Sequence, residues 1–216
     1  MILDRRSIID AMSAGSIAVR PYDPDALRSN SYDVHLSPWL SVHRRPFPAG
    51  ATASERLRNE RPPLDCAVDD PVMEIEIPRG GLVLEPGTLY LGATLEYTEA
   101  HNVVPWLDGK SSGGRKGLFI HVTAGRGDLG FCGHWTLEII VVEPLRVYAG
   151  MPVGQLTWFA VQRSVTGPSE PDYGAMEGSK YQNQGAAPVA SKMHRNFPLP
   201  DVWLARAEEA RIAGRK

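Results

Sequence analysis

The stretch Trp106–Gly117, with the sequence WLDGKSSGGRKG, places small residues beside hydroxyl and cationic side chains. Its glycines let a ligand approach the backbone closely, because no Cβ stands in the way. Ser111 and Ser112 offer hydroxyl donors. Lys110 and Arg115 add positive charge, and the planar guanidinium suits bidentate contact with phosphate. These residue types predict a phosphate-binding loop. The alternative is a glycine-rich surface turn between two strands.

Two common phosphate motifs are excluded by spacing. A Walker A loop needs a glycine five residues before its Gly-Lys-Ser, and Val104 occupies that position. Gly125–Gly130, GRGDLG, matches the dinucleotide-binding pattern, which requires a helix after the glycines. The segment that follows, Trp135–Val142, is rich in β-branched residues and predicts a strand. We therefore exclude a Rossmann nucleotide site.

Glu138 is the residue whose chemistry fits its surroundings least. It lies in the middle of Trp135–Val142, where both alternating faces are otherwise largely apolar, so the strand is expected to be buried on two sides. Burying an unpaired carboxylate is costly, and such a group is either paired or holds a proton more firmly. A carboxyl group that exchanges a proton near neutral pH can serve acid–base catalysis. The alternatives are a structural glutamate paired with an arginine, or a strand near a solvated edge.

Other polar residues are weaker candidates when taken singly. Asp128, in the glycine hairpin, could meet a sugar hydroxyl or a water, although aspartate is also common in tight turns. His121 alternates with apolar and small residues on an expected strand, and suits either a structural or a catalytic role. Tyr173, Lys180 and Gln184 lie on a polar tail and would matter if that tail closed over a nucleotide triphosphate.

The elements that must position these residues are mainly β-strands. Asp4 can cap a short helix that ends near Gly15, with Ile8, Ile9 and Met12 as its apolar positions. Beyond it, period-two alternation and frequent Pro or Gly predict strands at 31–36, 72–77, 82–84, 89–98, 118–123, 135–142, 145–148 and 155–161. No long helical pattern separates these strands. The sequence thus predicts a sandwich, jelly roll or barrel rather than a βαβ fold.

Three segments differ in character from this β-rich part. Residues 43–65 combine prolines with Arg44, Arg45, Arg56, Arg58 and Arg61, and favour a solvated loop over a basic binding patch. Residues 173–190 form a polar, small-residue tail that is expected to be mobile in isolation. After it, Asp201 can cap a closing helix over 202–213, with Trp203, Leu204, Ala207 and Ala210 as its packing side.

Composition narrows the class of protein. A chain of 216 residues that is 43% hydrophobic predicts one domain, or one domain with an appendage. A formal net charge of −2 gives no electrostatic reason to expect binding to nucleic acid or to an anionic membrane. No stretch has the length of a signal peptide or a membrane span, and the two cysteines, Cys66 and Cys132, are too few for a metal knuckle or a disulfide scaffold. We expect a cytoplasmic protein with reduced thiols.

Several separated motifs, in this order, resemble those of the dCTP deaminase family in the dUTPase-like superfamily. They are SYDV at 31–34, DGKSS at 108–112, HVTA at 121–124, GF at 130–131, LE at 137–138, GMPVGQL at 150–156 and KYQNQ at 180–184. The resemblance covers about residues 1–195. It implies a distorted β jelly-roll or barrel and a homotrimer whose active sites lie at subunit contacts. It also implies Mg²⁺ held largely by the nucleotide triphosphate. The domain is thus expected at 1–195, with 173–190 as a mobile lid and 196–216 as a helical extension.

The same resemblance implies roles for individual residues. Lys110, Ser111, Ser112 and Arg115 correspond to phosphate contacts, with Ser111 and Arg115 also placed near the catalytic water. The backbones of Val122 and Ala124 correspond to contacts with the base and its attacking water. Asp128 corresponds to the partner of the deoxyribose 3′-hydroxyl, and Glu138 to the proton shuttle. Tyr173, Lys180 and Gln184 correspond to lid contacts with sugar and phosphates.

Deamination of cytosine adds water at the ring carbon that bears the amine and then expels ammonia. Zinc deaminases activate this water with a His/Cys/Cys metal site and a Cys-x-x-Cys signature, which this chain lacks. A zinc-free route needs a carboxyl group such as Glu138. The expected activity is conversion of dCTP to dUTP and ammonia, in the supply of dUMP and dTTP.

Other functions stay open. One alternative, favoured by Thr123-Ala124-Gly125 and the 173–182 tail, is a bifunctional enzyme that also hydrolyses dUTP to dUMP and pyrophosphate. Further alternatives are a dUTPase without deaminase activity and a non-catalytic nucleotide-binding regulator.

Overall fold

The structure is a computed structural model that describes residues 1–47, 49–57, 61–162, 171–197 and 199–213. The described chain separates into two compact units. One comprises 1–42 and 73–189, and the other comprises 43–72 and 190–216. Every residue of the predicted site lies in the first unit. Among the described residues, no helix has the length and apolar character needed to cross a membrane.

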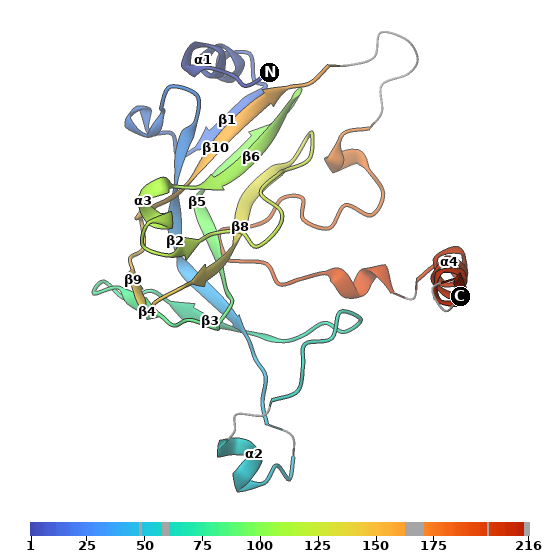
Figure 1. The fold of residues 1–216 in the computed structure, drawn as a ribbon. Coiled ribbons are helices and arrows are strands. Elements are labelled where there is room, and N and C mark those ends of the chain that lie inside the picture. Colours follow the sequence, from blue (N-terminus) through green and yellow to red (C-terminus); the bar gives the residue numbers. More distant parts are fainter. Residues whose placement is uncertain (48, 58–60, 163–170, 198, 214–216) are drawn as a thin grey trace. The chain divides into compact units, whose positions relative to one another are not determined.

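An eight-stranded sheet dominates the first unit (Figure 1). Its central path runs β6-β10-β2-β5-β8-β7, while β1 pairs with β5 and β3 pairs with β2. The bounds are β1 Ile17–Arg20, β2 Tyr32–His43, β3 Val72–Glu76, β5 Tyr90–Ala100, β6 Val103–Gly109, β7 Leu118–Phe119, β8 Cys132–Val141 and β10 Pro152–Ala160. A separate pair joins β4 Leu82–Leu84 to β9 Leu145–Val147. All registered pairs are antiparallel, which fits the mainly β prediction.

The core lies between the inward faces of the long strands. The largest fully buried side chains include Trp158 and Leu156 on β10, Leu137 and Ile139 on β8, and Tyr32 on β2. Burial of each aliphatic or aromatic side chain of this size contributes about 1.5–3 kcal/mol. These strands therefore supply a rigid support for the polar residues on their other faces.

The predicted N-terminal helix is confirmed as α1, Arg5–Ser13. The Asp4 side chain accepts a hydrogen bond from the N–H of Ser7 at 2.8 Å, which is an N-cap. Ile8 is fully buried and Met12 packs on the core, whereas Ile9 is exposed because it points away from the sheet side of the helix.

Each predicted strand has a counterpart in the structure, most of them with shifted ends, and the main differences lie around the serine loop. Residues 106–109, expected in a loop, form the end of β6, and Ser111–Gly114 form the short helix α3. The strand predicted at 118–123 stops at Phe119, so His121 does not lie on a strand. The cause is that β7 pairs with β8 over two residues, after which Glu138 N–H bonds to Ile120 O and the chain turns away.

The second unit carries the segments that differ in composition. It contains α2 Ala53–Leu57 and α4 Asp201–Ala213, and its arginines Arg56 and Arg61 each lie 5.1 Å from the ring centre of Phe47. The closing helix is confirmed, but its predicted packing side is wrong: every described residue of α4 is exposed, including Trp203 and Leu204. Arg58 of the Arg/Pro-rich segment and 214–216 of the extension lie outside the described residues.

Candidate active site

Strand β8 holds Glu138 with one face in the core and the other partly open. Cys132, Gly133 and then every second residue from Trp135 to Val141 are buried, whereas Thr136, Glu138 and Ile140 are half-buried. The prediction of burial on both faces is therefore wrong for this strand. The half-open face is the one that carries Glu138, so its carboxylate can be reached by a ligand.

The loop after β7 brings a backbone donor to this carboxylate. The N–H of Val122 donates a hydrogen bond to Glu138 Oε2 at 2.8 Å. Among the described residues, the Val122 N–H is the one hydrogen-bond partner of the Glu138 carboxylate, and no arginine or lysine forms an ion pair with this carboxylate. Val122 is 54% exposed, and Thr123 and Ala124 are exposed beside it. Val122 thus meets Glu138 at the surface of β8, and Ala124 lies two residues further along the same exposed loop.

A contact between a histidine and an aspartate connects this loop to the strand that leads into the serine turn. His121 Nε2 lies 3.4 Å from Asp108 Oδ1, and Asp108 is the register partner of Gln155 on the neighbouring strand β10. His121 precedes Val122, and Asp108 lies three residues before Ser111. The contact therefore fixes the Glu138 loop next to the serine turn within one chain.

Lys110 is anchored by a buried carboxylate. Its Nζ lies 2.6 Å from Asp33 Oδ1, while Arg28 Nη2 lies 2.7 Å from Asp33 Oδ2 and Gln155 Nε2 donates to Oδ1 at 2.8 Å. The Asp33 side chain is 2% exposed. Burial alone would raise the pKa of Asp33, but the hydrogen bonds from Lys110, Arg28 and Gln155 outweigh it and lower the pKa. Lys110 thereby fixes the start of the serine turn, a role that the sequence did not suggest.

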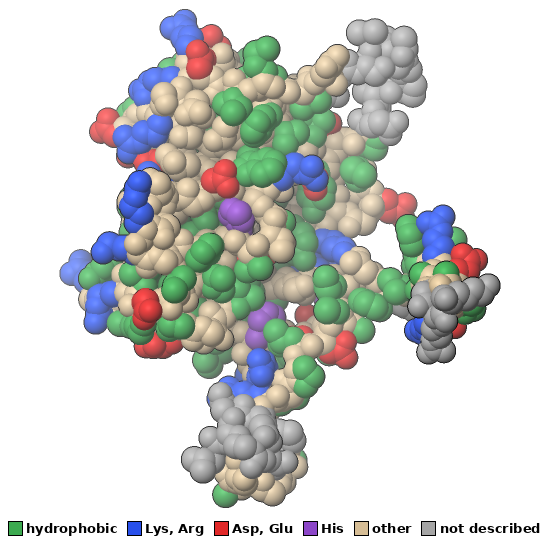
Figure 2. Space-filling model, in the orientation of Figure 1, with side chains coloured by type: hydrophobic (Ala, Val, Ile, Leu, Met, Phe, Trp, Pro, Cys, Tyr) green, Lys and Arg blue, Asp and Glu red, His purple; other side chains and the backbone are tan. Residues whose placement is uncertain are grey.

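The serine turn itself presents its polar groups outward. In α3, Ser111–Gly114, Ser111 and Ser112 are exposed, and Arg115 Nη1 donates to Ser111 Oγ at 3.3 Å. The turn rests on β7, since a Cβ on Gly113 would lie 3.4 Å from the side chain of Leu118. Lys and Arg side chains gather along the edge of the first unit that carries α3 (Figure 2). Two hydroxyls and a guanidinium meet here, as a phosphate contact requires.

The glycine hairpin that carries Asp128 is packed closely against β6 and β8. Leu107 N–H bonds to Gly125 O at 2.6 Å, and a Cβ on Gly125 would lie 2.3 Å from Leu107 O. A Cβ on Gly127 would lie 2.6 Å from the ring of Trp135. Both positions therefore require glycine for close approach. The strand β8 follows directly, which confirms the exclusion of a Rossmann site.

Asp128 faces a pocket shared with the C-terminal tail. The pocket has a volume of about 350 Å³, and its lining includes Asp128, Leu129, Tyr173 and Ser179. Tyr173 N–H bonds to Leu129 O at 2.7 Å, and the Tyr173 hydroxyl accepts hydrogen bonds from the N–H groups of Lys180 and Tyr181 at 3.1 and 3.0 Å. Two of the predicted sugar contacts, Asp128 and Tyr173, thus line one cavity, with the Lys180 backbone beside it.

Gln184 is attached to β8 rather than to the pocket. Its side chain accepts a hydrogen bond from Thr136 Oγ1 at 2.8 Å, and its backbone forms a parallel bridge with Gly133. Thr136 Oγ1 also accepts from Val189 N–H at 3.1 Å. The tail predicted to be mobile is therefore tied to β8 at several points, and Thr136, which the sequence reasoning overlooked, is one of them.

The predicted residues form two groups within this chain. Glu138, Val122 and Ala124 lie beside the serine turn, whereas Asp128 and Tyr173 line the pocket at the hairpin. In Figure 1, α3 and the short helical turn Tyr173–Ala175 (orange) lie well apart, with strands of the sheet between them.

With this geometry, the chain can be compared with known proteins. Residues 2–161 match the family model described as dCTP deaminase-like. The chain belongs to this family. Proteins named "dCTP deaminase, dUMP-forming" from Leptospira biflexa and Cytophaga hutchinsonii are each 41% identical to it over 198 residues, which is 91% of this chain and 98% and 99% of theirs.

A solved structure supports the predicted fold of the family. The 2′-deoxycytidine 5′-triphosphate deaminase from Agrobacterium tumefaciens superposes with a TM-score of 0.52 at 21% identity, covering 73% of this chain and 47% of that chain. At this identity the match shows the fold alone. The predicted family and the mainly β fold class are confirmed; the boundary at residue 195 stays a prediction.

Proposed function

We propose that this chain is a dUMP-forming dCTP deaminase. The first reaction is dCTP + H₂O → dUTP + NH₃, and the second is dUTP + H₂O → dUMP + pyrophosphate. Glu138 takes a proton from the water that adds to the ring carbon and returns a proton to the base as ammonia leaves. The proposal rests above all on the half-buried Glu138 carboxylate, which is held by the Val122 N–H and faces an open surface.

The neighbouring groups suit a nucleotide in this position. Ser111, Ser112 and Arg115 present hydroxyls and a guanidinium for the phosphates, and the exposed backbone at Val122 and Ala124 offers donors and acceptors to the base and the water. Asp128 and Tyr173 would hold the sugar, with Lys180 and Gln184 completing the lid. For Gln184 and Lys110 this role requires the side chain to leave its partner, Thr136 or Asp33.

The final product distinguishes a simple dCTP deaminase, which releases dUTP, from a bifunctional enzyme, which releases dUMP. The sequence predicts dUTP as the product, with dUMP formation as the alternative. Relatives that are 41% identical over 91% of the chain carry the name dUMP-forming, which favours the alternative. We therefore take dUMP, pyrophosphate and ammonia as the products.

We further propose that the active enzyme is a homotrimer with shared sites. The serine turn and the Asp128–Tyr173 pocket lie apart in one chain, and a neighbouring copy could bring the pocket of one subunit to the serine turn of the next (Figure 1). A site shared between subunits explains why each of these two groups of polar residues forms only part of a nucleotide site within one chain. It also explains why each group has partly open surroundings.

Mg²⁺ is proposed to enter with the nucleotide, bound through phosphate oxygens. Mg²⁺ prefers oxygen ligands and usually keeps several waters. The Asp33 carboxylate, near the serine turn, is already held by two cations and an amide, so it fits an anchoring role better than a metal site. The side chains that face the phosphates, Ser111, Ser112 and Arg115, fit contacts with a magnesium-bound triphosphate.

One assay tests the reaction. The protein is incubated with dCTP and Mg²⁺, ammonia and pyrophosphate are followed, and dCTP, dUTP and dUMP are separated by chromatography. We expect equal amounts of ammonia, pyrophosphate and dUMP. Accumulation of dUTP would restore the simple deaminase. Pyrophosphate from dUTP without ammonia from dCTP would indicate a dUTPase, and tight binding without product would indicate a regulator.

Mixing two inactive variants tests the shared site. Glu138→Gln, beside the serine turn, and Asp128→Ala, in the hairpin pocket, are each expected to be inactive alone. After the two proteins are unfolded and refolded together, some sites will contain one intact copy of each group if the groups come from different subunits. Recovery of activity only in the mixture supports the trimeric site, whereas no recovery in a mixture shown to form hetero-oligomers would contradict it.

A further inference from the structure

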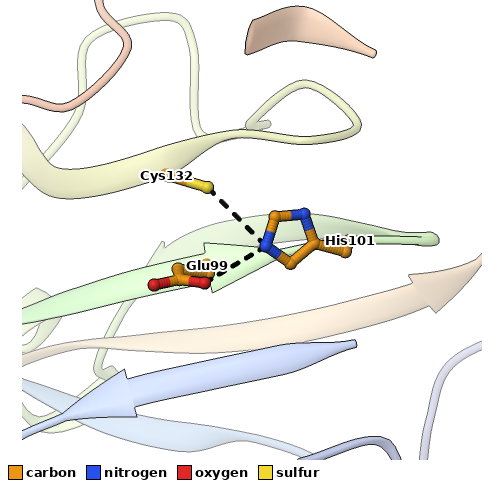
Figure 3. Close-up of side chains that lie close together, drawn as sticks. All are labelled: Glu99, His101 and Cys132. Carbon is orange, nitrogen blue, oxygen red and sulfur yellow. Dashed lines mark hydrogen bonds and ion pairs between the residues drawn. The ribbon is translucent and has the colours of Figure 1, made fainter. Parts of the chain in front are cut away.

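Three side chains with different donor atoms meet where β5 ends and β8 begins. Glu99 on β5 is the register partner of Cys132 on β8, so their side chains lie on the same face of the sheet. His101 follows Glu99 by two residues and returns to that face. Figure 3 shows the His101 ring pointing between the carboxylate and the thiol. The sequence signal, Glu-x-His opposite a strand-initial cysteine, is visible only when the strand register is known.

The distances between the donor atoms are short. His101 Nε2 lies 3.1 Å from Glu99 Oε2 and 3.9 Å from Cys132 Sγ, and all three donor atoms lie within 4.8 Å of one another. Ligands in a tetrahedral zinc site lie about 3.3–3.6 Å apart, from zinc–ligand bonds of about 2.0–2.3 Å. Small rotations of the three side chains would therefore bring their donor atoms to the distances at which all three can bind one metal ion. Among the described residues, this is the one group of three such side chains.

The combination of donors selects the class of metal. Imidazole nitrogen and thiolate sulfur favour zinc and related transition metals, whereas Mg²⁺ and Ca²⁺ prefer oxygen. The Glu99 carboxylate supplies negative charge. The cluster thus joins one soft ligand, one borderline ligand and one anion.

The charged groups around the cluster are compatible with this role. The guanidinium of Arg20 pairs with Glu99 Oε1, which leaves Oε2 turned toward His101. A partner that holds the second carboxylate oxygen orients a metal ligand in the way outer-shell groups do. Arg20 in turn lies over the ring of Tyr97, 5.7 Å from its centre.

We propose that Glu99, His101 and Cys132 form a structural binding site for one divalent ion of the zinc class, with water as the fourth ligand. Binding converts the Cys132 thiol to a metal-bound thiolate and releases its proton to solvent, and no electron is transferred. The site is separate from the deamination chemistry, because Glu138 lies further along β8 and has Val122 as its hydrogen-bond donor.

The position of the site gives it a structural consequence. Cys132 N–H bonds to Gln182 Oε1 at 3.1 Å, and Cys132 O accepts from Asn183 N–H at 2.7 Å. Gln182 Nε2 also donates to Gly130 O at 2.9 Å. A metal ion on Cys132 would therefore stabilise the base of the Asp128 hairpin together with the tail segment that lies on it.

Cobalt provides a direct test, because a thiolate bound to Co²⁺ gives an intense charge-transfer band in the near ultraviolet. Tag-free, fully reduced full-length protein is treated with a chelator and titrated with Co²⁺, and then with Zn²⁺ to displace it. We expect one equivalent of Co²⁺ to produce the band in wild type and in Cys66→Ser, which lacks the other, exposed cysteine. A wild type without the band, or a band lost in Cys66→Ser, would overturn the site.

Variants of the ligands complete the test without relying on activity. Cys132→Ser should abolish the band, and His101→Gln, a change at a partly exposed turn, should weaken Co²⁺ binding at least about tenfold. Zn²⁺ should raise the thermal midpoint of wild type but not of Cys132→Ser. An unchanged band and affinity in His101→Gln would contradict the proposal even if Cys132→Ser did not fold.

Discussion

The carboxylate of Glu138 accepts a hydrogen bond from the backbone N–H of Val122 at 2.8 Å. Because this donor comes from a loop, the contact holds the acid and the exposed backbone around Val122 in one fixed arrangement. General acid–base groups contribute about 10²–10⁴-fold to a rate. We expect Glu138→Gln to reduce ammonia release from dCTP by about this factor while nucleotide binding, measured by calorimetry, is retained.

Glu143→Gln is the matched control for that variant. Glu143 is an exposed glutamate in the turn after β8, so its replacement should leave ammonia release unchanged. Wild-type rates in Glu138→Gln would remove the central support for the proposed deaminase.

Asp33 should stabilise the fold in a pH-dependent way. Its pKa in the folded state is lowered, so its contribution is present above the pKa of the unfolded chain, about 3.9, and is lost as pH falls through the folded value. Removing one member of a buried ion pair costs about 3–5 kcal/mol. Denaturant unfolding of Asp33→Asn should show a loss of about this size at neutral pH, and the difference from wild type should shrink below about pH 4.

An exposed ion pair provides the comparison. Asp10 pairs with Arg6 at 3.3 Å on the surface of α1. Asp10→Asn should cost less than about 1 kcal/mol at any of these pH values. Equal effects of the two substitutions would show that the Asp33 pairs do not stabilise the serine turn.

Gly127 should tolerate no side chain. A Cβ there would lie 2.6 Å from the Trp135 ring and 2.9 Å from Pro105, and overpacking of this kind costs about 1–3 kcal/mol. Because Asp128 follows directly, Gly127→Ala should also raise KM for dCTP more than it lowers kcat. Gly185→Ala, at a position with no atom within 4 Å, should leave both the unfolding free energy and KM unchanged.

Thr136 should control the attachment of the C-terminal tail. Its hydroxyl donates to Gln184 and accepts from Val189 N–H, so Thr136→Val removes both contacts without a change of shape. We expect faster amide hydrogen exchange across 182–189, measured by mass spectrometry, with little change in the core strands. Thr123→Val, at an exposed position, is the control, and equal exchange in all three proteins would contradict this role.

The sequence predicted the strands well because their alternation follows directly from one buried face. It did not predict that β7 ends at Phe119 or that Trp106 lies in a strand, since both depend on pairing with distant segments, β8 and β10. Glu138 could be singled out because a carboxylate interrupts an apolar strand. The anchoring of Lys110 by Asp33 could not, because the two residues meet only after β2, β10 and β6 come together.

The strand β8 also limits how the length of this chain can vary. Thr136 and Glu138 lie on one of its faces and the core residues Leu137 and Ile139 on the other. Because side chains alternate between the two faces of a strand, one residue inserted between Cys132 and Thr136 would move each β8 side chain before the insertion to the opposite face. It would move the thiol away from Glu99 and break the bridge between Gly133 and Gln184. Insertions should therefore be tolerated in the Arg/Pro-rich segment at 43–65 and rejected here, even when the inserted residue is small.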